Sequence, residues 1–154
     1  MAWTTPKTDW EVGELVSPGD LNAVSENLAE LDRVRKTVAA HTTTADIVTP
    51  NTNNTFDDID SDNLNLTITT TGGDVLIHFH GPFTRGVVII DVEVDGTRRG
   101  DTNNGMMTTD NSQWHFVSFT RLIQGLNAGS HTFKLQTKRG TTLRAGAQFW
   151  VREI

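Results

Sequence analysis

Three aspartates at alternate positions are the residues whose spacing comes nearest to a metal site. Asp58, Asp60 and Asp62 follow one another at two-residue steps, and carboxylate oxygens are ligands that Ca²⁺ prefers. An EF-hand loop would need glycine where Asn63 stands and glutamate where Thr69 stands. We therefore favour a solvated strand edge and keep calcium as the weaker alternative, with no other cofactor expected.

A second candidate is the pair His78 and His80, which are separated by one residue. Alternate residues of a strand point to the same face, so the two imidazoles should lie together on one side of a sheet. Near a threefold axis such a pair could hold a metal, but two ligands are too few for a site on their own. Ordinary polar positions are therefore the favoured interpretation.

Two shorter patterns carry less information. Arg99-Gly100-Asp101 spells an integrin-type tripeptide, but a loop of this composition explains the glycine and the aspartate through turn chemistry. Ser130-His131 is no catalytic dyad, because neighbours on a strand face opposite sides. The sequence also lacks a nucleophile elbow, a glycine-rich phosphate loop and a zinc helix. We expect no enzymatic activity.

Composition limits the partners. The chain has 154 residues, a formal net charge of -6 and no cysteine, which rules out disulfides and thiolate sites. An acidic chain without clustered Lys and Arg is a poor candidate for binding nucleic acid. No apolar run is long enough to span a bilayer, and the N-terminal residues do not resemble a signal peptide. A hydrophobic content of 36% is low for an independent globule and favours burial between subunits.

One helix is clearly marked. Ser17 is placed to be the N-cap, Pro18 the first helical residue and Asp20 the third, which together approach a capping box. From Leu21 to about Val38 the sequence contains neither glycine nor proline. We predict an N-terminal attachment arm over 1–17, an amphipathic helix over 18–41 and a β domain over 42–154.

The apolar residues of this helix form a narrow seam. They recur at alternating three- and four-residue steps, as in a coiled coil: Leu21, Val24, Leu28, Leu31 and Val38. A helix this short is marginal alone in water, so the seam needs a partner. Sister helices are favoured over the chain's own β domain, because a core-facing helix shows a wider stripe. Trp3 and Trp10 lie in the arm, where we expect them to act as interface anchors.

After residue 45 the chain is typical of a mainly β protein. Short alternating segments separated by glycine-rich turns favour a sandwich or a barrel. The run Val87-Val88-Ile89-Ile90 is apolar on both faces. One face should pack in the sandwich, and the other, with Val88 and Ile90 as candidate interface residues, should contact a neighbouring subunit.

The β region is similar to the C1q/TNF-like jelly-roll domains of tailed-virus structural proteins. The segments that carry this resemblance are Phe56 to Asp62, Val92-Glu93-Val94-Asp95-Gly96-Thr97, and Leu126 to Phe133 leading to Phe149-Trp150-Val151-Arg152. The opening Trp3-Thr4-Thr5-Pro6, with Gly13-Glu14 and Leu21-Asn22, resembles the N-terminus of phage tail-fibre and other virion proteins. The region 97–112 fits no part of the family pattern.

The resemblance implies a homotrimeric jelly-roll β-sandwich that is attached to the virion by its N-terminal segment. The expected function is that of a non-enzymatic structural protein on a tailed virus particle. It would serve as capsid decoration or as a tail or baseplate fibre, and its partners would be itself and capsid or tail proteins. The alternative is a carbohydrate- or receptor-binding module for host attachment, in which the loops 97–112 and 139–142 would contact the ligand.

Overall fold

Most of the chain forms antiparallel strands. The computed structural model describes residues 15–36, 38–49, 55–84, 86–109 and 114–154. One helix, α1 (Pro18–Lys36), precedes the strands, whose bounds are as follows: β1 (Val38–Thr42), β2 (Ile47–Val48), β3 (Asp57–Asp58), β4 (Asn65–Thr84), β5 (Ile89–Val94), β6 (Thr97–Arg98), β7 (Met107–Thr108), β8 (Trp114–Thr137), β9 (Thr142–Leu143) and β10 (Gln148–Glu153).

The two long strands, β4 and β8, pair along nearly their whole length and bend together. The register shifts between Gly73 and Val75. Gly72 and Gly73 have φ angles of 96° and 148°, and Gly125 has a φ of 67°. Such positive angles suit glycine because it has no Cβ. The expected separate strands on either side of these glycines are therefore halves of one bent ladder.

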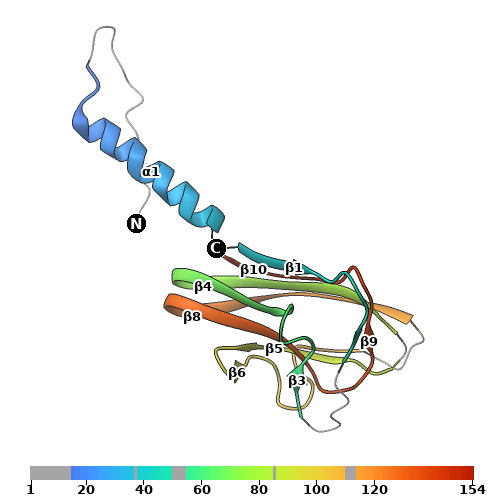
Figure 1. The fold of residues 1–154 in the computed structure, drawn as a ribbon. Helices are drawn as coiled ribbons and strands as arrows, with labels where there is room; N and C mark the ends of the chain where they lie inside the picture. Colours follow the sequence, from blue (N-terminus) through green and yellow to red (C-terminus); the bar gives the residue numbers. More distant parts are fainter. Residues whose placement is uncertain (1–14, 37, 50–54, 85, 110–113) are drawn as a thin grey trace. The chain divides into compact units, whose positions relative to one another are not determined.

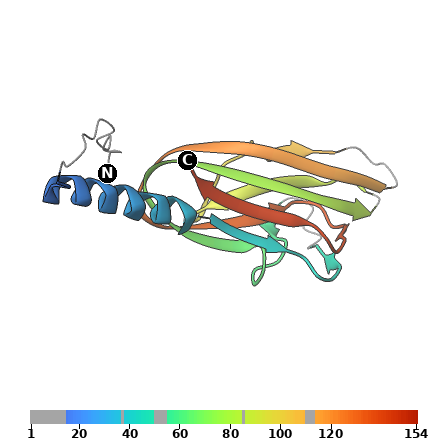
Figure 2. The same cartoon turned by 90° about the horizontal axis from the view of Figure 1, so that it is seen from above.

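The bend folds a single hydrogen-bonded sheet into two layers (Figure 1). In the first layer, β1, β10, the second half of β4 and the first half of β8 lie side by side. Figure 2 shows these four strands next to one another. In the second layer the first half of β4 pairs with the second half of β8, followed by β5 and β6. This strand order confirms the expected jelly-roll β-sandwich.

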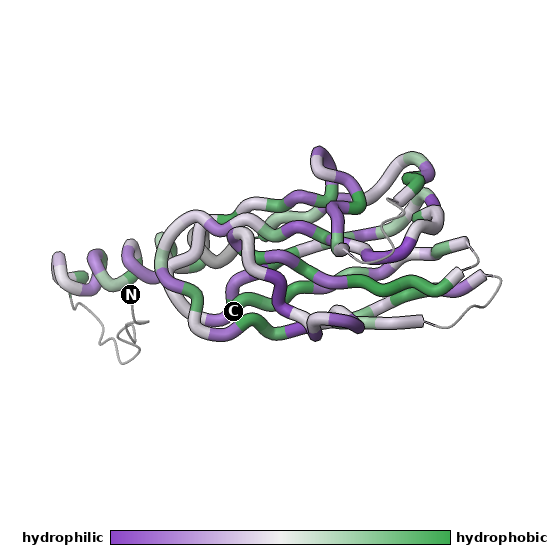
Figure 3. The backbone as a smooth tube through the Cα atoms, turned by 90° about the horizontal axis from the view of Figure 1, so that it is seen from below, coloured by the Kyte–Doolittle hydropathy of each residue, from purple (hydrophilic) through white to green (hydrophobic). Residues whose placement is uncertain are grey.

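The core lies between the two layers. Alternate residues along much of β4, β8 and β10 are buried, and the largest fully buried ones are aromatic: Phe79, Phe83, Phe133 and Phe149. Apolar segments run along the strands, as the hydropathy colouring of Figure 3 shows. The period-two alternation read from the sequence is thus the alternation between core and outer surface.

Helix α1 begins where its capping residues predicted. The Asp20 backbone N–H donates to Ser17 Oγ, and the Ser17 N–H donates to Asp20 Oδ2, so the capping box is formed. The other end differs from the prediction. The helix ends at Lys36, and Val38–Thr42 is a strand paired with β10. The chain divides into two units between residues 37 and 38, and not at residue 42 as predicted.

No described helix is long and apolar enough to span a membrane.

The predicted interface role of Val88 and Ile90 is wrong. Both side chains are fully buried, and they belong to the core cluster between the layers. On the outer side of β5, Ile89 is only 7% exposed and Asp91 is fully buried. The loop that follows in the same chain covers this side, because Arg98 and the Gly100 N–H bond to the Asp91 carboxylate. The run is apolar on both faces because one face lies in the core and the other is buried within the same chain.

Candidate functional site

The apolar seam of helix α1 is exposed on the described part of the unit that contains the helix. Leu21, Val24, Leu28 and Leu31 are 60%, 47%, 61% and 50% exposed. Spacing of three and four residues keeps these side chains on one side of the helix. The structure therefore places the four seam residues on one side of α1, where no other described residue of the helix covers them. Val38, the last predicted seam residue, lies instead on strand β1.

A row of rings crosses the outer face of the first layer, and we call it the aromatic strip: Trp150, His78, His80, Phe116 and Trp114. Trp150 stacks on His78 with ring centroids 5.1 Å apart. His80 stacks on Phe116 at 5.8 Å. The pairing registers of the strands explain this arrangement. The β10–β4 register places Trp150 beside His78, and the β4–β8 register places His78 beside Thr120.

The two histidines at the centre of the strip contact each other directly. His78 Nε2 lies 3.1 Å from His80 Nδ1, and His78 Nδ1 lies 2.8 Å from Thr120 Oγ1. Partial burial, with the nearby His80 as a second cause, lowers the pKa of His78 below its ordinary value. The direct contact between the two rings confirms that both face the same side of the sheet.

The strip ends in two strongly exposed aromatic side chains. Trp114 is 65% exposed and Phe116 is 64% exposed. They line a shallow depression of about 240 Å³ together with Pro82 and His115. The Arg144 guanidinium lies 5.5 Å from the centre of the Trp114 ring. Drug-sized ligands usually occupy 300–1,000 Å³ pockets, so this surface fits a flat contact better than an enclosed ligand.

The region 97–112, for which the sequence offered no interpretation, is organised around a buried carboxylate over the part that the structure describes. Asp91 on β5 is fully buried and accepts hydrogen bonds from Arg98 Nε at 2.9 Å and from the Gly100 N–H at 2.8 Å. The Arg98 guanidinium also lies 3.8 Å from the centre of the Phe56 ring, and the Met106 N–H donates to the Ile90 carbonyl. These contacts hold the loop against the outer side of β5.

The tripeptide Arg99-Gly100-Asp101 has structural roles in this loop. A Cβ at Gly100 would lie 2.4 Å from the carbonyl carbon of Gly105 and 2.7 Å from Asp91 Oδ1. Asp101 Oδ1 accepts hydrogen bonds from the N–H groups of residues 103 and 104, which is the geometry of an Asx turn. Turn chemistry and close packing account for the glycine and the aspartate, as the sequence indicated.

The alternating aspartates do not share a site. Asp58 Oδ2 lies 3.2 Å from Lys134 Nζ. The Asp60 carboxylate accepts hydrogen bonds from the backbone N–H groups of Asp62 and Asn63 and from the side-chain amide of Asn63. Among the described residues, no group of three or more His, Asp or Glu side chains is placed to hold a metal ion. The carboxylates of Asp58 and Asp60 are engaged in contacts within the fold.

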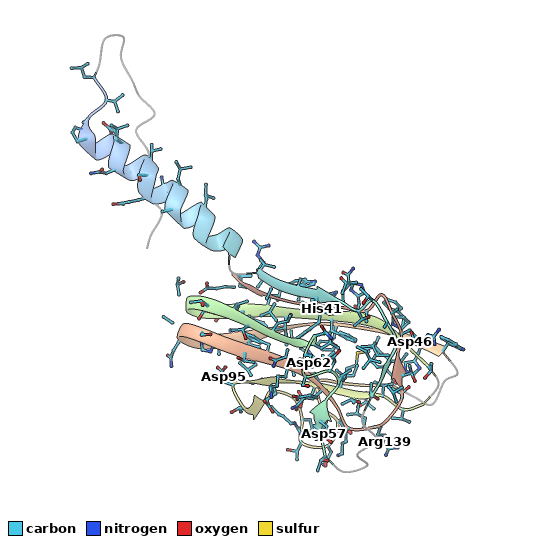
Figure 4. The ribbon with its side chains drawn as sticks, viewed as in Figure 1. His41, Asp46, Asp57, Asp62, Asp95 and Arg139 are labelled. Carbon is cyan, nitrogen blue, oxygen red and sulfur yellow. The ribbon has the colours of Figure 1, made fainter. Side chains whose placement is uncertain are left out.

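His131 forms a separate charged pair in the second layer. Its Nδ1 lies 2.6 Å from Asp95 Oδ2, and its Nε2 lies 2.8 Å from the Asn127 carbonyl oxygen. The hydrogen bond to Asp95 is the main cause that raises the pKa of His131. Asp95 and Asp46 lie at opposite ends of the sandwich (Figure 4). Both ring nitrogens of His131 therefore face acceptors within the fold, which gives the ring a structural role.

Two predicted anchors, Trp3 and Trp10, lie outside the described residues. The structure adds Phe116 and Trp150, which the sequence reasoning did not assign to any surface. The alternation Trp114-His115-Phe116 was a usable signal, because alternate strand residues share a face. The position of Trp150 beside His78 depends on a register between distant segments, which no local pattern gives.

Comparisons with known proteins add little. No family model and no curated protein matches the chain. Among solved structures, a CBM35 from Paenibacillus barcinonensis superposes with a TM-score of 0.36 at 14% sequence identity, over 79% of this chain and 96% of that one. A superposition this loose supports no conclusion, so fold and function must be argued from this chain's own geometry.

Proposed function

We propose that the chain is a non-enzymatic, homotrimeric structural protein of a tailed virus particle, either capsid decoration or a tail or baseplate fibre. Its N-terminal arm and helix would dock and trimerise, and its β-sandwich would be presented to the outside. The observation that carries this proposal is the exposed apolar seam on the described part of α1. The similarity of the sequence to virion jelly-roll proteins supplies the viral context.

The energetics of the helix favour association. Four apolar side chains within about three turns are roughly half exposed, so each would gain about half of the roughly 1.5–3 kcal/mol that full burial contributes. A helix of 19 residues has little stability of its own in water. Parallel copies would place each leucine or valine opposite its equivalents, as in coiled-coil packing. The sandwich supplies its own core, so association needs no contribution from Val88 or Ile90.

The test is the mass of two helix variants. Leu28→Asp with Leu31→Asp should lower the solution mass from the trimer to the 17.0 kDa chain, because charges at a seam position prevent close packing. Ala29→Asp is the matched control, because it adds the same side chain at an exposed helix position outside the seam. Equal masses for all variants would contradict trimerisation through α1.

Placement on the particle needs a separate experiment. Purified virus particles would be labelled with antibodies against residues 38–154, the unit that follows the helix. Label on the head would favour capsid decoration, and label on the tail would favour a fibre or baseplate role. Particles without label or detectable peptide would contradict the virion assignment.

A second function, carbohydrate or receptor binding, is favoured by one observation. Exposed aromatic faces such as those of Trp114 and Phe116 are the kind of platform on which a sugar ring packs, because ring C–H groups contact an aromatic face over a large area. Both side chains line the same shallow depression, together with Pro82.

The glycan alternative is tested by substitution of the platform. On a glycan array, Trp114→Ala and Phe116→Ala should each abolish a signal seen with the unmodified protein. Leu122→Ala is the control, because Leu122 is 44% exposed on the same strand but does not line the depression. No signal from the unmodified protein, or equal signals from all variants, would remove this alternative.

A further inference from the structure

We propose that His78 and His80 form a binding site for a divalent transition-metal ion of the Zn²⁺ or Ni²⁺ class on the outer face of the first layer. The two imidazoles alone are too few ligands for a closed structural site, so the proposed site is an open one in which water supplies the other ligands. It does not depend on self-association or on the proposed viral role. Imidazole nitrogen is a preferred ligand of these ions. Alternate positions on a strand suit a chelating pair, since both rings project from the same face.

The distance between the two nitrogen atoms fits bidentate binding. His78 Nε2 and His80 Nδ1 are 3.1 Å apart. With zinc–nitrogen bonds of about 2.0–2.1 Å, this separation corresponds to a nitrogen–metal–nitrogen angle of about 95–100°. That angle lies between those of octahedral and tetrahedral sites. The ion would replace the hydrogen bond that now joins the rings, without a large movement of the strand.

The surroundings hold the first ligand in position. His78 stacks on Trp150, and its Nδ1 lies 2.8 Å from the Thr120 hydroxyl. When Nδ1–H donates to Thr120 Oγ1, the proton is fixed on that nitrogen and Nε2 keeps its lone pair for the metal. Metal-binding histidines characteristically use their second nitrogen in this way. Thr120 is therefore a positioning residue of the site.

The proton balance of binding follows from this arrangement. When the Nδ1 proton of His78 faces Thr120, His80 Nδ1–H is the donor to His78 Nε2. For the metal to bind, that proton moves through solvent to the other nitrogen of His80, so a neutral pair releases no net proton. Water completes the coordination, because the described residues place no third His, Asp or Glu ligand nearby.

The experiment is a titration of the full-length chain with Zn²⁺ at pH 7.5. Calorimetry should give one ion per chain, with at least tenfold weaker binding for His78→Gln and for His80→Gln. His131→Gln is the matched control and should bind as tightly as the unmodified protein, since both His131 nitrogens are already engaged. Thr120→Val should weaken binding about tenfold, the usual cost of losing such a positioning contact.

Nuclear magnetic resonance of the unmodified protein makes the test independent of the variants. Zn²⁺ should shift the ring signals of His78 and His80 and leave those of His41, His115 and His131 in place. In the metal-free protein, nitrogen shifts should show the proton of His78 on Nδ1, and Thr120→Val should remove that preference. No binding at millimolar Zn²⁺, shifts at other histidines alone, or unchanged affinity in both glutamine variants would overturn the proposal.

Discussion

Removal of the buried Asp91 carboxylate should be among the most damaging single changes in the β-sandwich. In Asp91→Ala, Arg98 Nε and the Gly100 N–H lose their acceptor. Breaking a buried ion pair from one side typically costs about 3–5 kcal/mol. Because the Arg98 side chain is 28% exposed and can recover water, we expect the lower end, about 3 kcal/mol. A domain of this kind is usually stable by about 5–15 kcal/mol.

The assay is equilibrium unfolding in urea, with hydrogen exchange as a local readout. The midpoint should fall at an unchanged slope, because the surface exposed on unfolding stays the same. The Gly100 and Met106 amides, which bond to Asp91 and to the Ile90 carbonyl, should exchange faster in the variant. The control is Asp46→Ala. Its partner Arg144 and Asp46 itself are 43% and 38% exposed, so a loss of no more than about 1 kcal/mol is expected.

The ion pair can be separated from the rest of the loop by a double-mutant cycle. Asp91→Ala combined with Arg98→Met should cost less than the sum of the two single changes, with a coupling of about 1–2 kcal/mol. If Asp91→Ala stays within about 1 kcal/mol of the unmodified protein, the carboxylate does not organise the loop. In that case another contact must cover the outer side of β5.

Three further predictions concern other parts of the fold. The Asp95 hydrogen bond raises the pKa of His131 above 6.5, and that bond offsets partial burial to lower the pKa of Asp95 below 3.8. The pair therefore contributes its full stabilisation between pH 3.8 and pH 6.5. This stabilisation is lost as pH rises through the folded pKa of His131, and also as pH falls through the folded pKa of Asp95. Thermal unfolding should show the largest cost of His131→Gln near pH 5 and a smaller one near pH 9; an equal cost at both would contradict the pairing. Gly100→Ala should lower stability by about 1–3 kcal/mol in urea unfolding, because its Cβ would overlap backbone atoms that cannot move away. Addition of a chelator or of Ca²⁺ should leave the melting temperature unchanged, since Asp60 already accepts three hydrogen bonds; a clear shift would revive the calcium alternative.

Features encoded in neighbouring residues could be predicted from the sequence. The capping box at Ser17 and Asp20 is local chemistry, and it is formed as expected. The turn Asp95-Gly96 joins β5 to β6 with positive φ angles at both residues, as that dipeptide favours. The alternation of apolar and polar residues correctly placed the core of the sandwich.

Features that depend on distant partners could not be predicted. The segment Val38–Thr42 becomes a strand because it pairs with β10, and its own composition does not distinguish a helix end from a strand. The run around Val88 and Ile90 was interpreted as an interface because the sequence did not show that Asp91 binds Arg98 over β5. The contact between Trp150 and His78 likewise depends on a register between segments about seventy residues apart.

The central claim is self-association through α1, and solution mass tests it most directly. Light scattering on the full-length chain should give about three times 17.0 kDa, and the Leu28→Asp, Leu31→Asp variant should give the mass of one chain. A single-chain mass for the unmodified protein at every concentration and salt level would contradict the account. A trimer that survives the substitutions would show that the contacts lie elsewhere in the chain.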